Sequence, residues 1–229
     1  LGLPMGAMWQ DSFAKLEQRE IRLHLERPRN ALSDAVESIV VVARDYAAWD
    51  DTFKFMQDGN PAYLANNFVD STFDQNRVNV ALFYELQGKV RYQRGRDFTA
   101  KADAAVPAYF LTLPADSPIR RLTAKSIVGI ASTQDGLYLV AACQVLKSVE
   151  AVATNGTLVF ARRLDQLELA RLSRSLRLDL QLLPPSGTAA DLQPDRIEIL
   201  NDKAISAIAV LRDLSGAPVA RLRVTTERA

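Results

Sequence analysis

The fold is decided by the run Asp45-Tyr46-Ala47-Ala48-Trp49-Asp50-Asp51-Thr52-Phe53, followed by Phe55 and by Asn60-Pro61-Ala62-Tyr63-Leu64-Ala65-Asn66-Asn67-Phe68. Asp45 and Trp49 lie four residues apart, so they share one face of a helix. We expect Trp49 and Phe53 to pack this helix on a sheet, with Trp49 mostly buried. The adjacent carboxylates of Asp50 and Asp51 point in different directions on a helix and so do not form an acid–base pair by themselves.

Helical signals continue on both sides of this run. Residues 10–57 read as helix in one or two pieces, with Asp11 as a candidate N-cap and Pro28 as an interruption or kink. Apolar residues repeat at helical spacing in a stripe made of Leu32, Val36, Ile39, Val40 and Ala43. The stripe is broad enough for both a sheet and a partner helix, which predicts a homodimer through the N-terminal helices. Asp58-Gly59-Asn60-Pro61 is a strong helix stop, and a third helix is expected from Pro61 to about Phe73.

The second part of the chain has the alternation of strands. Two hairpins are predicted, one around Gln87-Gly88 and one around Gln134-Asp135-Gly136. A strand over 157–163, a helix after Asp165 and strands near 178–182, 197–200, 204–212 and 219–226 follow. Residues 95–118 read as an irregular connection. The order predicts an α+β fold, with long N-terminal helices packed on a mainly antiparallel sheet, in a single domain of residues 1–229 (helical region 10–75, sheet region 78–229).

Composition excludes several functional classes. The 229 residues carry a net charge of +1, which gives no global field for nucleic acid or an anionic membrane surface. The single cysteine, Cys143, lies in an apolar run and is expected to be an inert buried thiol. No apolar run reaches the ~20 residues of a membrane span. The uncharged residues 1–8 can be native or foreign to the natural protein.

Catalytic and metal-binding patterns are missing. With one histidine, His24, expected on a solvated helix face, the chain has no Ser-His-Asp triad, Cys-His dyad or transition-metal cluster. Gly-rich phosphate loops and calcium loops of the EF-hand type are also missing. We therefore expect no enzyme activity, no catalytic residue, no metal and no cofactor. A hydrolase using Asp50 or Asp51 is disfavoured because partner residues are scarce.

The run at Asp45–Phe53, together with Asn66-Asn67, resembles the signature of the CHASE domain of the fourth type. Weaker matches lie in the N-terminal helices, at Gly88 and over residues 156–165. The resemblance implies an extracytoplasmic sensory domain between two membrane spans of a bacterial receptor. It implies a fold related to PAS and Cache modules with a small-molecule pocket. It also implies a cytoplasmic output, often a diguanylate cyclase or phosphodiesterase, and no catalytic string of either enzyme occurs here. The alternative is a soluble small-molecule binding or adaptor domain without membrane attachment.

Local chemistry suggests where a ligand binds. The predicted ligand-binding residues are Trp49, Asp50, Tyr63, Asn67, Tyr84 and Arg91. Aromatic rings give a stacking wall, Asp50 is suited to an ammonium group and Arg91 to a carboxylate, so a carboxylate or amino acid is favoured over a nucleotide. The structural alternative is that Trp49 and Phe53 only pack the helix. Arg91, Arg94 and Arg96 with Tyr92 form either a solvated edge or a carboxylate clamp.

Overall fold

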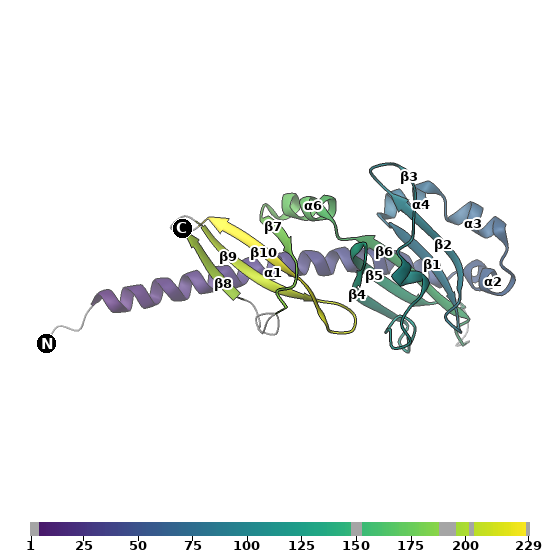
Figure 1. Cartoon of the computed structure of the whole chain (residues 1–229), viewed down its shortest axis with the longest axis horizontal. Helices are drawn as coiled ribbons and strands as arrows, with labels where there is room; N and C mark the ends of the chain where they lie inside the picture. The colour runs from purple at the N-terminus through teal and green to yellow at the C-terminus, as the bar shows by residue number, and fades with distance from the viewer. Residues whose placement is uncertain (1–4, 148–152, 188–195, 202–203, 228–229) are drawn as a thin grey trace. The chain divides into compact units, whose positions relative to one another are not determined.

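The computed structural model describes residues 5–147, 153–187, 196–201 and 204–227 (Figure 1). The chain divides into two compact units. The six-stranded unit consists of Asp34–Asp165 with Asp213–Ala217, and the four-stranded unit consists of Leu1–Ser33, Gln166–Arg212 and Pro218–Ala229. Residues 1–4 and the side chain of His24 lie outside what the structure describes. The predicted fold class, α+β with a long N-terminal helix and mainly antiparallel pairing, is confirmed.

One helix dominates the N-terminal region. α1 (Met5–Ala47) is continuous through Pro28, so the predicted interruption is wrong, and Asp11 lies inside the helix instead of capping it. The chain leaves helical geometry at Trp49, whose backbone is extended (φ −73°, ψ 136°), and α2 (Asp50–Asp58) follows. The predicted helix from Pro61 is two short helices, α3 (Pro61–Asn67) and α4 (Asp70–Asn76), because the backbone departs from helix at Phe68 and Val69.

The six-stranded sheet has the order β3-β2-β1-β6-β5-β4, with every neighbouring pair antiparallel. Its strands are β1 (Val80–Glu85), β2 (Val90–Asp97), β3 (Ala102–Ala104), β4 (Ser126–Thr133), β5 (Gly136–Gln144) and β6 (Gly156–Arg163). Both predicted hairpins are confirmed. The stretch read as irregular contains β3, the end of β2 and the short helix α5 (Ala108–Leu111).

The two faces of this sheet bury different clusters, because successive strand side chains point to opposite sides. On the face that packs on α2 and α3, the Phe83 ring contacts those of Phe55 and Phe68, with centroids 5.3 and 5.4 Å apart. The other face buries Val80, Leu82 and Tyr84 with Phe110 and residues of the 113–119 segment. Burial of each large apolar side chain contributes about 1.5–3 kcal/mol, so both clusters stabilise the unit.

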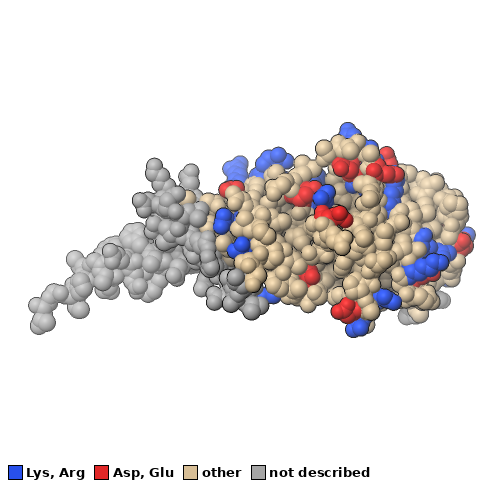
Figure 2. Space-filling model, viewed as in Figure 1, with Lys and Arg blue, Asp and Glu red and all other residues tan. Residues whose placement is uncertain are grey.

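Charged side chains are interspersed over the described part of the face in Figure 2. At the β2–β3 edge, Arg96 forms a two-pronged pair with Asp74 (2.8 and 2.9 Å), and Arg94 donates to Asp103 at 2.7 Å and to the Phe68 carbonyl. The side chain of Arg96 is only 5% exposed. The arginines therefore bind the protein's own carboxylates, and the prediction that they form a clamp for a ligand carboxylate is wrong.

The four-stranded unit contains α6 (Gln166–Leu176), β7 (Asp179–Leu183), β8 (Arg196–Asn201), β9 (Ala204–Arg212) and β10 (Pro218–Glu227). Its sheet has the antiparallel order β7-β10-β9-β8. The core of this unit includes Leu169 and Leu172 of α6 with Leu222 and Val224 of β10, all buried. Arg27 of α1 donates to the Leu176 carbonyl at 3.0 Å, so the first part of α1 contacts the end of α6.

Candidate binding site between α2 and α3

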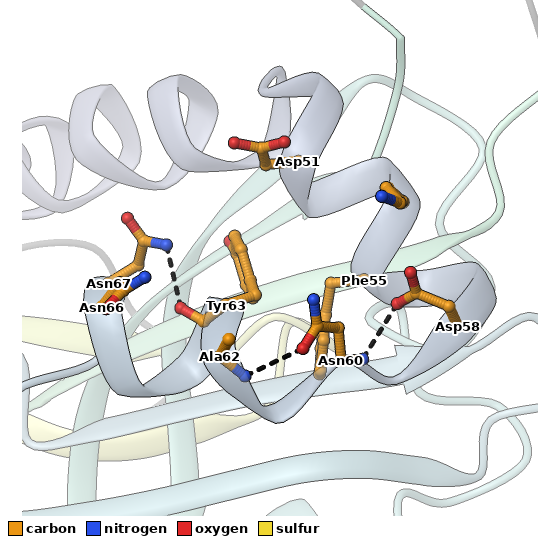
Figure 3. Close-up of a pocket in the computed structure, with 9 residues that line it drawn as sticks. Asp51, Phe55, Asp58, Asn60, Ala62, Tyr63, Asn66 and Asn67 are labelled. Atoms are coloured by element: carbon orange, nitrogen blue, oxygen red, sulfur yellow. Dashed lines mark hydrogen bonds between the residues drawn. The ribbon is translucent and has the colours of Figure 1, made fainter.

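A pocket of about 180 Å³ lies between α2 and α3, and the turn that joins the two helices shapes it (Figure 3). α2 ends at Gly59, which adopts the left-handed conformation (φ 69°) that glycine accepts without strain. Asn60 then caps α3 by accepting from the Ala62 backbone N–H at 3.0 Å, and Pro61 occupies the first turn. The residues that predicted the end of a helix therefore form a tight turn between α2 and α3.

Aromatic side chains form the apolar part of the pocket. The rings of Phe55 and Tyr63 stack with centroids 4.9 Å apart. The Tyr63 hydroxyl lies 2.5 Å from the buried Thr52 hydroxyl. Burial raises the pKa of Tyr63 well above its ordinary value, so the phenol stays neutral at physiological pH. The ring is thus fixed in position and offers an apolar surface to the pocket.

Charged groups of α2 line the same pocket. Asp51, Lys54 and Asp58 are spaced three and four residues apart, which places all three on one helix face. Asp58 accepts from the Asn60 backbone N–H at 2.9 Å. Lys54 has no ion pair or hydrogen bond with the described residues. The pocket therefore contains two carboxylates, of which that of Asp58 already accepts one hydrogen bond, and the ammonium group of Lys54.

Amide side chains complete the lining on α3. Asn67 donates from its Nδ2 to the Tyr63 carbonyl at 2.8 Å, and its amide oxygen remains an acceptor. Figure 3 shows Asn66 and Asn67 together on one side of Tyr63, and Asp51 on α2 above Tyr63. The arrangement combines an aromatic wall, both signs of charge and neutral amides, which suits a small polar molecule.

A family model described as the CHASE4 domain matches residues 31–183, more than half of the chain. This chain belongs to the CHASE4 domain family. The resemblance drawn from Asp45–Phe53 is confirmed, and the matched region contains the whole α2–α3 pocket.

Relatives of this CHASE4 domain are sensor proteins. FilI, the methanogenesis regulatory histidine kinase of Methanothrix harundinacea (strain 6Ac), is 25% identical over 177 residues, which are 76% of this chain and 20% of FilI. The chain thus spans about a fifth of that relative. The extracellular domain of vpHK1S-Z8, named as a histidine kinase, has a TM-score of 0.62 at 11% identity, with 94% of this chain and 96% of that chain covered.

The periplasmic domain of Vibrio cholerae LuxQ has a TM-score of 0.57 at 9% identity, covering 91% of this chain and all of the LuxQ domain (100%). At these identities the two structures show a shared fold. The CHASE4 chain is a sensor domain with the fold of periplasmic sensor domains. Within the described residues, no helix is both long and apolar enough to cross a membrane.

The CHASE4 structure brings together only two of the six predicted ligand-binding residues, Tyr63 and Asn67. Trp49 does not line the pocket, and its side chain is partly exposed but mostly buried, as predicted. It stacks on Tyr46 with centroids 4.3 Å apart. Asp50 is exposed and also lies outside the lining, and its neighbour Asp51 is there instead, because successive helix residues point about 100° apart.

Tyr84 and Arg91 are also outside the pocket. Tyr84 faces the opposite side of the sheet, where its hydroxyl donates to the Phe110 carbonyl at 2.5 Å. Arg91 pairs with Glu85 at 2.9 Å and donates to the carbonyls of Phe55 and Gln57, both at 3.3 Å, so the protein itself uses its donors. The predicted assignment of these two residues to the same pocket is wrong.

The reactive groups that remain in the described part of the CHASE4 chain are possible metal ligands and the thiol of Cys143. No three histidine, cysteine, aspartate or glutamate side chains gather there to hold a metal ion. Cys143 is buried as expected, and burial raises the pKa of its thiol to about 12. Sequence reasoning did not assign to the site Phe55, Ala62 and the polar lining residues Asp51, Lys54, Asp58, Asn60 and Asn66. The only sequence signals for the polar ones were the regular charge spacing of a helix and a turn.

Proposed function

We propose that this CHASE4 domain is the extracytoplasmic sensor of a membrane-anchored receptor, and that the α2–α3 pocket binds a small zwitterion such as an amino acid. The observation that carries the proposal is the joint presence of Asp51, Lys54 and Asp58 on one helix face above the Phe55–Tyr63 stack. Carboxylates suit an ammonium group, and the unpaired lysine suits a carboxylate. The pocket is below the ~300–1,000 Å³ of drug-sized sites, which argues against a nucleotide.

The charge balance of the pocket gives this proposal its specificity. A simple anion would face two carboxylates, and a simple cation would face the Lys54 ammonium. A zwitterion satisfies both signs at once, because its two charges are separated by about the length of one residue. The neutral amides of Asn66 and Asn67 can then accept from or donate to the rest of the molecule.

A thermal-shift screen of amino acids and small carboxylates tests the site. A ligand at about 100 times its Kd adds ~2.7 kcal/mol of stability, which raises the Tm of a domain of this size by roughly 5–10 °C. Lys54→Gln and Asp51→Asn should each remove most of this shift. Asp50→Asn is the matched control, because it changes the adjacent carboxylate that lies outside the pocket.

The outcomes separate cleanly. Loss of the shift in Asp51→Asn with retention in Asp50→Asn supports the pocket. Hits that survive both Lys54→Gln and Asp51→Asn place the ligand elsewhere and refute the site. A screen in which no amino acid or carboxylate shifts the Tm at millimolar concentration refutes this ligand class.

We further propose that the output of the receptor is a histidine kinase. Support comes from FilI, which is named as one and shares 25% identity over 76% of this chain. A diguanylate cyclase or phosphodiesterase is the alternative that the family resemblance alone would give. Reading the gene beyond both ends tests both the identity of the output domain and the membrane anchoring, for which flanking apolar segments of ~20 residues are expected. Their absence would favour a soluble binding domain instead.

We also propose that the chain forms a homodimer through α1. The contact surface on α1 must differ from the apolar stripe that the sequence predicted. Val36, Ile39, Val40 and Ala43 are buried within the monomer and are not available to a partner. Val41 is 58% exposed on the same helix. Disulfide crosslinking of the membrane-bound receptor should therefore succeed with Val41→Cys and fail with the control Ile39→Cys. Crosslinking with neither variant contradicts this surface.

A further inference from the structure

Arg91 lies at an irregularity in the pairing of β1 with β2. Tyr84 of β1 is opposite Val90 of β2. The preceding residue of β1, Phe83, is opposite Tyr92, so the register shifts and Arg91 has no partner on β1. One extra residue on one strand of an antiparallel pair is a β-bulge, which bends the strand and changes the direction of its side chains.

The bulge breaks the alternation of side chains along β2. Val90 packs with the cluster that contains Tyr84, on one face of the sheet. Tyr92 lies on the opposite face, where its ring centroid is 5.4 Å from that of Phe68. In a regular strand, two residues that are two apart point to the same face. The bulge therefore lets the consecutive residues Arg91 and Tyr92 both reach the face on which α2 and α3 pack.

On that face the Arg91 guanidinium is bound to the last turn of α2. Its Nε donates to the Phe55 carbonyl and its Nη2 to the Gln57 carbonyl, both at 3.3 Å, while its Nη1 pairs with Glu85 at 2.9 Å. An added Cβ on Gly59 would lie 3.2 Å from Nη2, so the guanidinium lies directly against the turn that ends the helix. The Phe55 carbonyl also accepts from the Gly59 backbone N–H at 2.8 Å. One acceptor thus joins the helix cap to the arginine.

The sequence of α2 explains why a cation from another strand matters at this position. The last turn of α2 contains no basic residue, and the helix ends with Asp58. A carboxylate at the C-terminus of a helix is unfavourable, whereas a cation there is stabilising. Asp58 lines the pocket from this unfavourable position. β2 therefore supplies, through Arg91, the positive charge that the end of α2 lacks.

We propose that Arg91 is a positioning residue of the α2–α3 pocket, which fixes the part of the wall formed by Phe55 and Asp58 and does not itself contact the ligand. Arg91 is not among the residues that line the pocket. Its Cζ lies 6.0 Å from the centroid of the Phe55 ring, which stacks on Tyr63. Its effect on binding rests on the function proposed for the pocket, whereas its hold on α2 can be tested without a ligand.

Amide hydrogen exchange of the free chain tests the hold on α2. Arg91→Gln removes the donors to the helix carbonyls, so the amides of the last turn of α2 and of Gly59 should exchange about tenfold faster. Arg91→Lys keeps the charge without the planar fork and should restore part of this protection. Lys89→Gln removes an exposed cation from the adjoining turn and is the matched control, with no change expected. Unchanged exchange in Arg91→Gln overturns the inference, and so does an equal acceleration in β5, which would mean a general loss of stability.

Calorimetric titration with L-alanine and with L-alaninamide, which lacks the carboxylate, separates positioning from direct contact. Arg91→Gln should weaken both probes by the same factor, about tenfold, with partial recovery in Arg91→Lys. Lys54→Gln, which changes a lining residue, should weaken L-alanine selectively. A selective loss of L-alanine binding in Arg91→Gln would make Arg91 a ligand contact and overturn the inference, as would faster exchange with unchanged affinity for both probes. Binding of neither probe, together with faster exchange in Arg91→Gln, counts against the function proposed for the pocket and leaves the hold of Arg91 on α2 supported.

Discussion

Phe68 is the residue whose removal should reveal what holds the six-stranded unit together. It is 3% exposed, and its ring lies within 5.4–6.1 Å of the rings of Phe83, Tyr92, Tyr46, Tyr63 and Phe160. These partners come from α1, α3, β1, β2 and β6. One side chain therefore joins the helices to three strands of the sheet.

Phe68→Ala should cost about 3–5 kcal/mol, the usual cost of a large aromatic truncation in a core. The upper half of this range is expected, since each aromatic pair contributes about 0.5–1.5 kcal/mol beyond area burial. Val69→Ala is the matched control, because the neighbouring side chain is 38% exposed. It should cost no more than about 1 kcal/mol.

Urea unfolding followed by tryptophan fluorescence measures the difference. The chain has two tryptophans, and a Trp9→Phe background leaves Trp49 as the reporter of the six-stranded unit. The two variants should differ by at least ~2 kcal/mol in the free energy of unfolding, or roughly 4–8 °C in Tm. A difference below ~1 kcal/mol would refute the view that this aromatic cluster joins the helices to the sheet.

Three further measurements follow from the structure. Trp49→Ala should cost only about 1–2 kcal/mol, because the mostly buried indole lies outside the fully buried core, and a loss of about 3 kcal/mol or more in urea unfolding would place it in that core. The hydrogen bond from Arg96 lowers the pKa of Asp74, so this pair should stabilise the fold fully above about pH 5 and less as pH falls through the lowered pKa. Asp74→Asn should therefore flatten the pH dependence of the free energy of unfolding, measured in urea, between about pH 5 and 3. An unchanged pH profile contradicts the pairing. Gly95→Ala should cost about 2–3 kcal/mol in thermal unfolding, since its Cβ would lie 2.4 Å from a backbone carbonyl oxygen. The added Cβ of Gly129→Ala meets only the flexible end of a leucine side chain, so this variant should lose less stability. Equal losses in the two variants would be inconsistent with this distinction.

Sequence by itself determined the local elements and the family. The turn residues Gly88 and Gly136 have positive φ, and glycine at these positions predicts the two hairpins without reference to the rest of the chain. Asp58-Gly59-Asn60-Pro61 likewise encodes its own turn through a left-handed glycine and a capping asparagine. The run Asp45–Phe53 was sufficient for the family, which the match over residues 31–183 confirms.

Only the tertiary structure decided which residues meet at a site. β1 pairs with β6, which is more than 70 residues away, and no local preference specifies such a partner. That pairing and the helices above it decide that Phe83 faces Tyr63 while Tyr84 faces Phe110. The same long-range packing explains why Asp51 lines the pocket, where the sequence had predicted Asp50. Alternation along a strand and rotation along a helix fix which side chains share a face, but the long-range packing of the elements determines what that face contacts.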